Sequence, residues 1–315
     1  MTAYLIRRFV TSLIVILGIA FITFLAVHII APSPGRAVLG DRASQAAVNA
    51  FNKQAGYDQP VWVQFLKYMW ALLHGNLGFS YKSNQTVDSL IIENAPHSMW
   101  LSGISLLLSI LIAIPLGIFQ AVKRNSVADQ SITAFAFTCY SMPQNFLGLL
   151  LIGFLAISFH LFPSEASQSE KIIPYITAVR ANFLPILTLT LTAVAAYSRY
   201  MRSSGLDALA QDYIRLARAK GLSEARVLRR HLFRNASLPM ITLIGLSIPA
   251  LLGGNLVVEN LFNSHGLGLL FINELGNEDF NTVIALTLLG GVATVVGNLI
   301  ADVALTVADP RIRIS

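Results

Sequence analysis

The sequence predicts an all-α polytopic membrane protein with six transmembrane helices, cytoplasmic N- and C-termini and a long extracytoplasmic loop after the first helix. Composition is the first reason: 55% of the 315 residues are hydrophobic and only 12% are charged. This leaves too little polar surface for a water-soluble domain of this size. In addition, six apolar runs approach the roughly 20 residues that a helix needs to cross a bilayer. Basic residues gather in the segments that would lie on one side of these runs.

The first predicted span is Phe9–Ile30, which follows Arg7 and Arg8. Its apolar run is longer than the core of a typical signal peptide, and no small-x-small cleavage site follows it. We therefore expect a retained helix, with residues 1–30 forming the N-terminal cytoplasmic end and the first span.

Residues 31–98 are predicted to be an extracytoplasmic loop that contains short helices. Between glycine and proline breaks, Asp41–Lys53 is a polar helix candidate, and Val61–Leu73 carries apolar residues at helical spacing. The tryptophan and tyrosine residues of the second segment are typical of a helix at the water–lipid interface. The loop lacks the length and apolar content for a sizeable core of its own.

Residues 99–315 are predicted to form a five-helix core. The expected spans are Met99–Phe119, Ile132–Phe159, Phe183–Tyr200, Pro239–Val258 and Val283–Val307. Prolines within such spans are tolerated where neighbouring groups satisfy the freed carbonyls. Glycines in the last two spans permit close helix approach. These glycines are Gly245, Gly253, Gly254, Gly290, Gly291 and Gly297.

The orientation follows from the basic residues. With a cytoplasmic N-terminus, 15 of the 22 lysines and arginines fall in predicted cytoplasmic segments, and five of the other seven lie in the 31–98 loop. A loop of that length contributes little to topology. This bias places both termini and the basic loop 202–238 in the cytoplasm. Basic residues that flank apolar spans usually record orientation, so nucleic acid is not an expected partner.

Within that loop, the stretch Gln211–Gly221 reads Q-D-Y-I-R-L-A-R-A-K-G. Asp212 is predicted to cap a short helix, and Gly221 to end it with a left-handed turn. Ser223 would then begin a second helix, Glu224–Asn235. The pattern predicts a helix lying across the membrane face between two helical arms. A solvated loop that binds anionic membrane lipid is the alternative reading.

The segment D-Y-I-R-L-A-R-A-K-G-L at 212–222 resembles the cytoplasmic coupling loop of ABC importer permeases of the dipeptide/oligopeptide transport family, B-type subunit. Further motifs resemble this family in the same order along essentially the whole chain. They are L-I-R-R-F at 5–9, D-Q-P-V-W-V-Q-F-L at 58–66, G-N-L-G-F-S at 75–80, S-M-P-Q-N-F-L-G-L-L-L-I at 141–152, R-N-A-S-L-P at 234–239, G-L-G-L-L at 266–270 and D-P-R-I-R at 309–313. The resemblance implies the six-helix fold of a type I ABC importer permease.

The same resemblance implies a function in the cell membrane. The chain would be the permease subunit of an ATP-driven importer of di- or oligopeptides, with nickel chelates and glutathione as alternative substrates. Its partners would be a homologous second permease, two ATPase domains or subunits and an extracytoplasmic substrate-binding protein. ATP and Mg would be bound by the ATPase partners, and no cofactor is expected in this chain. The residues expected to dock on the ATPase are Asp212, Tyr213, Arg215, Ala217, Arg218, Ala219, Lys220 and Gly221.

The sequence departs from the family pattern in three places. Tyr213, Ile214 and Arg215 stand where the general importer pattern has Glu-Ala-Ala, which is a common difference in the peptide branch. His265–Gly268 replaces the usual Pro-Gly-Leu-Gly, and Ala31–Gly35 replaces the usual Pro-Gly-Asp-Pro.

No catalytic or metal-binding residues are predicted in the chain. It contains no G-x-x-x-x-G-K-[ST], H-E-x-x-H or G-x-S-x-G motif, and its histidines are scattered singly. A secondary transporter or a channel is the alternative of a different class. A secondary transporter usually needs ionisable residues near the bilayer midplane, and the predicted spans are nearly free of them. Asp302 is interpreted as a helix-packing or interfacial residue.

Four polar residues are candidates for a translocation pathway. Ser141, Gln144 and Asn145 surround Pro143 in the third predicted span, and Asn255 lies in the fifth. They would either face a hydrated peptide path or only pack helices and cap the break at Pro143. Both readings remain open from the sequence.

Overall fold

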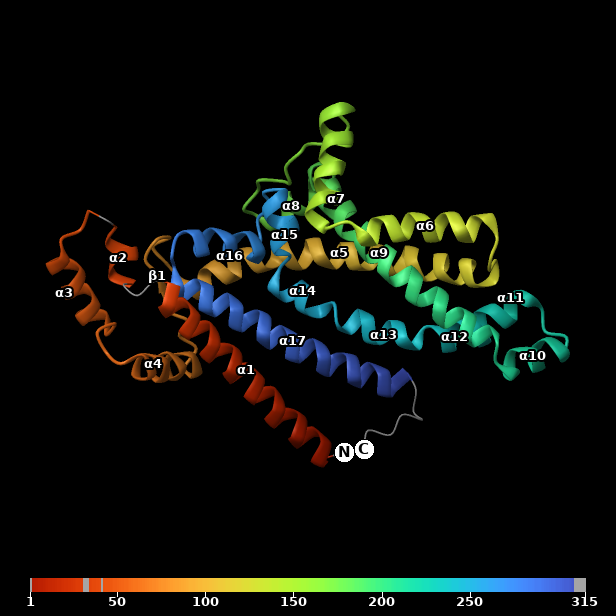
Figure 1. Cartoon of the computed structure of the whole chain (residues 1–315), viewed down its shortest axis with the longest axis horizontal. Coiled ribbons are helices and arrows are strands. Elements are labelled where there is room, and N and C mark those ends of the chain that lie inside the picture. The colour runs from red at the N-terminus through yellow and green to blue at the C-terminus, as the bar shows by residue number, and fades with distance from the viewer. Residues whose placement is uncertain (1, 31–33, 41, 309–315) are drawn as a thin grey trace.

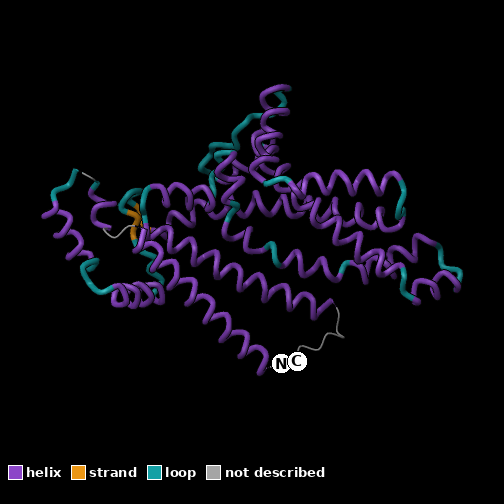
Figure 2. Tube along the Cα trace, in the orientation of Figure 1, coloured by secondary structure: helices purple, strands orange, loops and turns teal. Residues whose placement is uncertain are grey.

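A computed structural model describes residues 2–30, 34–40 and 42–308. Helices make up most of this part of the chain (Figure 2). The longest are α1 (Thr2–Ile30), α5 (Val87–Val122), α9 (Val179–Leu209) and α17 (Phe280–Ala308). By length and composition these four helices could cross a membrane, and the number rises to six if two bent helix pairs each count as one span. The D-P-R-I-R motif lies outside the described residues.

Helices α5 and α9 form the centre of the bundle. A Cβ atom added at Gly117 of α5 would lie 2.6 Å from Cβ of Met201 on α9, and one added at Gly205 of α9 would lie 2.8 Å from Cβ of Ala121. Glycine at these two positions therefore lets the helix backbones approach closely.

Helix α17 packs between α1 on one side and α13 (Leu238–Gly245) with α14 (Ile248–Gly253) on the other. An added Cβ at Gly245 would lie 2.2 Å from Cβ of Ala301, and one at Gly297 would lie 3.0 Å from Cβ of Ile248. The predicted role of Gly245 and Gly297 in close packing is confirmed. Asp302 of α17 forms an ion pair with Arg8 of α1, consistent with its interpretation as a helix-packing residue.

The predicted span Ile132–Phe159 is a bent pair of helices. Helix α6 (Val127–Ser141) is followed by α7 (Gln144–Leu151), which continues into the π-helical segment η1 (Ile152–Ser158), and the two parts meet at 108°. Met142 has an extended backbone with φ −78° and ψ 132°. The residue before a proline is disfavoured in the α conformation, so the helix breaks before Pro143.

The predicted span Pro239–Val258 is also interrupted. Helix α14 ends at Gly253, since Gly254 has φ 76° and ψ 171°, a conformation that favours glycine. The last residues of the expected span begin a separate helix, α15 (Leu256–Leu261). At its other end the span is preceded, at a 45° bend, by residues Glu224–Ala236. These comprise α11 (Glu224–Arg226), the π-helical segment η2 (Val227–Leu232) and α12 (Phe233–Ala236).

Both short helices predicted between the first two spans are present. Helix α3 (Gln45–Ala55) begins where the Ser44 hydroxyl accepts a hydrogen bond from the Ala47 N–H, and α4 spans Val61–Leu73 as expected. Asp41, the predicted start of the first helix, lies outside the described residues. The other elements here are α2 (Pro34–Leu39) and the antiparallel pair β1 (Phe79–Ser80) and β2 (Gln85–Thr86). Helix α5 already begins at Val87, within the segment expected to be a loop.

The two ends of the molecule carry different structures (Figure 1). Helices α2–α4 gather at one end, and α10 (Asp212–Ala219) lies with α11 at the opposite end. Helix α1 begins and α17 ends toward the side that carries α10. Helix α7 projects from the side of the bundle, near α8 (Ile172–Thr177) and α15.

A buried carboxylate holds α15, α5 and α16 (Leu267–Gly276) together. Oε1 of Glu259 accepts hydrogen bonds from the Ser98 hydroxyl and the Asn255 N–H, both at 2.8 Å. Oε2 accepts from the N–H groups of Gly268 at 2.8 Å and Leu269 at 3.3 Å, in the first turn of α16. A carboxylate at a helix N-terminus is favoured because the free N–H groups and the helix dipole are both directed toward it.

Glu259 lies outside the candidate spans and has no exposed surface. Burial raises its pKa, and the four hydrogen bonds oppose this shift. Every polar neighbour in this cluster is a donor, because the Ser98 hydroxyl itself accepts from the Leu267 N–H and so donates to Glu259. The arrangement is therefore complementary to an ionised carboxylate.

We predict that Glu259→Gln destabilises the protein by about 2–4 kcal/mol, because the amide turns two donor hydrogens toward groups that are themselves donors. Thermal unfolding of the purified protein in detergent would show a clear fall in Tm. Glu93→Gln is the matched control, since Glu93 is exposed on the surface of α5. Equal Tm values for the two variants would contradict the structural role of Glu259.

Candidate functional sites: a basic helical loop and a polar pocket

Helix α10 is present in the predicted basic stretch. Gln211 occupies the N-cap position with an extended backbone, so Asp212 is the first helical residue and not the cap as expected. Gly221 follows with φ 76°, which confirms the predicted left-handed turn. Ser223 stands before the next helix as expected, although its side chain makes no capping hydrogen bond.

The helix is amphipathic, and its buried face packs on the bundle. Ile214 and Ala217 lie in an apolar cluster with Met201 of α9 and Val227 of η2. Ala217 is only 5% exposed, so its side chain contacts this chain and does not belong to a free docking face, contrary to expectation. The helical phase that buries Ile214 also turns Ala217 inward, three residues further on.

The opposite face of α10 is exposed. Its residues follow the i, i+3, i+4, i+7 spacing of one helix face: Asp212, Arg215, Leu216 and Ala219. Lys220 and Gly221 are also exposed, and Tyr213 is half-buried. Leu216, which the sequence analysis did not include, is 56% exposed and places an apolar side chain among these polar ones.

One ion pair fixes the turn after α10. The Arg218 guanidinium donates to both carboxylate oxygens of Glu224, with Nη2–Oε1 at 2.6 Å and Nε–Oε2 at 3.1 Å. Bidentate geometry holds α10 against α11. Arg215 is 3.6 Å from Asp212, but both side chains are highly exposed, and such a pair adds little stability.

A pocket of about 270 Å³ lies between α5, α9, α14 and the bend between α6 and α7. Most of its lining is apolar, from leucine and alanine side chains, and we call it the polar pocket after the hydroxyl and amide groups set into that lining. It brings together Gln144 and Asn255, two of the four predicted pathway residues. Its other polar groups come from Ser102, Ser105, Tyr140, Thr192, Tyr197 and Ser247. The hydroxyl of Tyr197 is hydrogen-bonded to that of Ser247. No charged side chain is among the residues that line this pocket.

The other two predicted pathway residues lie elsewhere. Ser141 and Asn145 are exposed and do not line the pocket. The Asn145 side-chain oxygen accepts a hydrogen bond from the Phe146 N–H at the start of α7. Asn255 lines the pocket, and its side-chain oxygen also caps α15 by accepting a hydrogen bond from the Val258 N–H. It therefore has both a position at the pocket and a capping role.

Sequence reasoning missed the contacts between α6 and α9. Asp129 of α6 forms a bidentate ion pair with Arg202 of α9, with distances of 2.7 and 2.8 Å. Arg199 of α9 lies over the rings of Phe137 and Tyr140. In the sequence analysis both arginines were used only to predict the orientation of the chain in the membrane. A sequence pattern that draws attention to Asp129 was present, because Ser126 and Asp129 have the spacing of a capping box.

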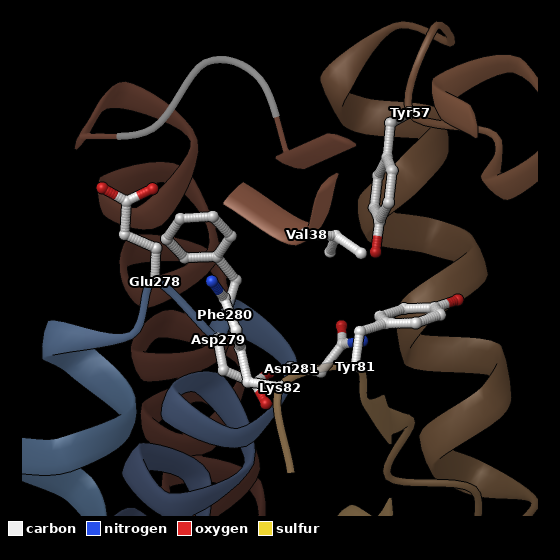
Figure 3. A pocket seen from close by; sticks show the side chains of 8 residues that line it. All are labelled: Val38, Tyr57, Tyr81, Lys82, Glu278, Asp279, Phe280 and Asn281. Atoms are coloured by element: carbon white, nitrogen blue, oxygen red, sulfur yellow. The ribbon is translucent and has the colours of Figure 1, made fainter. Parts of the chain in front are cut away.

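A much smaller pocket, of about 20 Å³, lies where the segment before α5 meets the start of α17 (Figure 3). Tyr57 and Tyr81 line it on one side, and Asp279 and Phe280 line it on the other. A space of this size holds no more than a water molecule or two. Since the Asn281 amide also donates to the carbonyl of Phe79, this region joins the segment before α5 to the start of α17.

Two family models together match almost the whole chain. "Binding-protein-dependent transport system inner membrane component" matches residues 113–314, and the corresponding N-terminal model matches residues 1–102. A solved structure titled as inward-facing conformations of the MetNI methionine ABC transporter matches with a TM-score of 0.55 and 16% identity. It covers 70% of this chain and 96% of that chain. This likeness concerns the fold.

Curated relatives are similar over their full length. The oligopeptide transport system permease protein AppB of Bacillus subtilis is 37% identical over 317 residues, which cover 99% of this chain and 100% of that protein. The dipeptide transport system permease protein DppB of Escherichia coli K12 is 32% identical, with 99% of each chain covered. The glutathione transport system permease protein GsiC of Salmonella paratyphi A is 34% identical, again with 99% of each covered. This chain is thus a multi-pass membrane protein that belongs to the family of binding-protein-dependent transport system inner membrane components, the permeases of ABC transporters.

Proposed function

We propose that this chain is the permease subunit of an ATP-driven importer that moves di- or oligopeptides across the cell membrane. The observation that carries the proposal is its full-length similarity to permeases named for oligopeptide and dipeptide transport. Glutathione is a second candidate substrate, supported by the similarity to a glutathione permease. Because glutathione is itself a small peptide, one polar pathway would suit either substrate.

The proposed topology has six spans with both termini in the cytoplasm. It counts each bent pair as one span, which the lengths and composition of the helices allow. The directions of α1 and α17 support it, because their terminal ends both point toward the side that carries α10. Residues 1–30 would form the cytoplasmic end and first span, residues 31–98 the extracytoplasmic loop, and residues 99–315 the core with the cytoplasmic loop 202–238.

The loop around α10 would be the docking element for an ATPase subunit. Its exposed face presents Asp212, Arg215, Leu216 and Ala219, and its buried face joins it to α9 and η2. A partner that engages the exposed face would therefore displace the packed helices with it. The complex would contain a homologous second permease, two ATPase subunits that bind ATP and Mg, and an extracytoplasmic binding protein that delivers the substrate.

The polar pocket would form part of the substrate pathway. Gln144, Asn255 and the surrounding hydroxyl groups offer hydrogen bonds to peptide groups without a fixed charge. ATP binding would close the ATPase pair and move the docked loops. The pathway between the two permeases would then change from inward-facing to outward-facing.

The deciding experiment is uptake of a labelled dipeptide into proteoliposomes that contain the complete transporter, with ATP inside and binding protein outside. We expect uptake that requires ATP and both ATPase subunits. Uptake driven by a proton gradient without ATPase subunits would refute the proposal in favour of a secondary transporter. Labelled glutathione, tested in parallel, distinguishes the two candidate substrates.

The topology predicts which positions react with a membrane-impermeant maleimide. In a Cys139→Ala background, Gln54→Cys at the exposed end of α3 should label in intact cells or spheroplasts. Ala225→Cys beside α10 should label only after permeabilisation. Both chosen positions are exposed, so access to the reagent depends on the side of the membrane. Labelling of Ala225→Cys in intact spheroplasts would overturn the proposed orientation.

Gly221→Arg is predicted to uncouple transport while leaving the protein in the membrane. The position has φ 76° and open space around an added Cβ, so the change strains the turn beside the docking face without a clash in the core. Peptide uptake should fall about tenfold or more at an unchanged protein level, as expected for loss of a coupling energy of 1–3 kcal/mol. Gly75→Arg is the control: it shares the positive φ and the open space but lies beyond α4. Equal uptake by the two variants would count against docking at α10.

A further inference from the structure

Helix α6 is connected to the rest of the bundle mainly through α9. It begins at Val127 and ends at Ser141, beside the bend that carries Tyr140 and Gln144 into the polar pocket. Part of its surface is open, since Phe135 is 61% exposed. A helix of this length spans about 22 Å. It thus runs from the α5–α6 turn to the polar pocket, with α9 alongside.

The first attachment lies at the beginning of α6. The Asp129 side chain is 2% exposed and pairs with both Nε and Nη2 of Arg202. The same carboxylate accepts from the Asn125 N–H at 2.9 Å, which ties in the α5–α6 turn. A bidentate pair has one defined geometry, so it fixes the start of α6 relative to α9 more firmly than a single exposed hydrogen bond would.

The second attachment lies near the end of α6. The Arg199 guanidinium carbon is 4.6 Å from the ring centre of Phe137 and 4.8 Å from that of Tyr140. These are cation–π distances. Arg199 and Arg202 are one turn apart on α9, yet they reach opposite ends of α6. The two arginines therefore fix both the position and the tilt of α6 relative to α9.

The C-terminal end of α9 leads directly into α10. It ends at Leu209, and α10 begins at Asp212. Met201 and Ala208 of α9 share one apolar cluster with Ile214 of α10. This cluster packs α10 against the part of α9 that carries the two arginines.

We propose that Arg202 with Asp129, and Arg199 with its two aromatic partners, are positioning residues that make α6 follow α9 when the basic loop moves. Movement of α10 then shifts Tyr140 and Gln144 at the polar pocket. This inference rests on the proposed function, since it assigns a route between the docking loop and the substrate pathway. The test therefore measures the coupling between ATP hydrolysis and peptide transport directly.

The test compares peptide uptake and ATP hydrolysis in the same proteoliposomes, both normalised to assembled transporter. For Arg202→Gln we expect ATP hydrolysis within about twofold of the unmodified protein, and about tenfold less peptide imported per ATP, a typical coupling energy. Arg202→Lys keeps the charge but loses the bidentate geometry, so its ratio should be intermediate. If Arg202→Gln does not assemble, Arg202→Lys alone decides the question.

Arg180→Gln is the matched control on the same helix. Arg180 is exposed near the start of α9 and donates to the carbonyl of Leu161, away from the contacts between α6 and α9, so the ratio of peptide to ATP should be unchanged. If the Arg202 variants import as much peptide per ATP as the unmodified protein, the positioning role is wrong. This holds whether uptake and hydrolysis both fall by the same factor or neither falls. Absence of ATP-dependent uptake by the unmodified protein would instead refute the proposed function.

Discussion

The carboxylate of Glu259 is the interaction on which the packing of α15 and α16 depends. Its four donors come from α5, the start of α15 and the first turn of α16, so one side chain fixes three segments at once. Glycine is required around it: an added Cβ at Gly266 would lie 2.3 Å from Oε2, and one at Gly268 would lie 2.8 Å from the Leu256 nitrogen. The motif G-L-G-L-L at 266–270 therefore has a structural explanation. It supplies a backbone cradle for a carboxylate of the same chain.

The Asp129–Arg202 pair follows the same physical rule in another part of the bundle. Burying a charge costs free energy unless the charge is paired and its remaining hydrogen-bonding positions are satisfied. Asp129 meets this condition through Arg202, the Asn125 N–H and the Thr133 hydroxyl. Both buried carboxylates thus bind protein groups, and neither lines the polar pocket. Their saturation by donors is typical of residues that hold helices in place.

The sequence was sufficient for features that depend on local patterns. Val61–Leu73 matched α4, and Gly221 adopted the expected left-handed turn, because helical spacing and glycine preference are local properties. It was insufficient where distant groups decide. Pro143 could have kinked a span or broken it, and Ser98 and Glu259 are 161 residues apart. The family resemblance assigned Ala217 to the docking face, but the packing of Ile214 in a cluster with α9 sets the phase of α10 and buries Ala217.

The polar pocket differs from these two ionic sites because no charged side chain is among the described residues that line it. Its lining offers hydroxyl, amide and aromatic groups among leucine and alanine side chains, whereas the Asp129–Arg202 ion pair between α6 and α9 lies outside it. A fixed charge in a pathway would bind oppositely charged substrates tightly and repel others, because electrostatic interactions strengthen away from water. Hydroxyl and amide groups can each donate or accept, so they serve peptide backbones regardless of side chain. In the proposed pathway, such a lining would favour passage over retention and would leave substrate choice to the proposed binding protein.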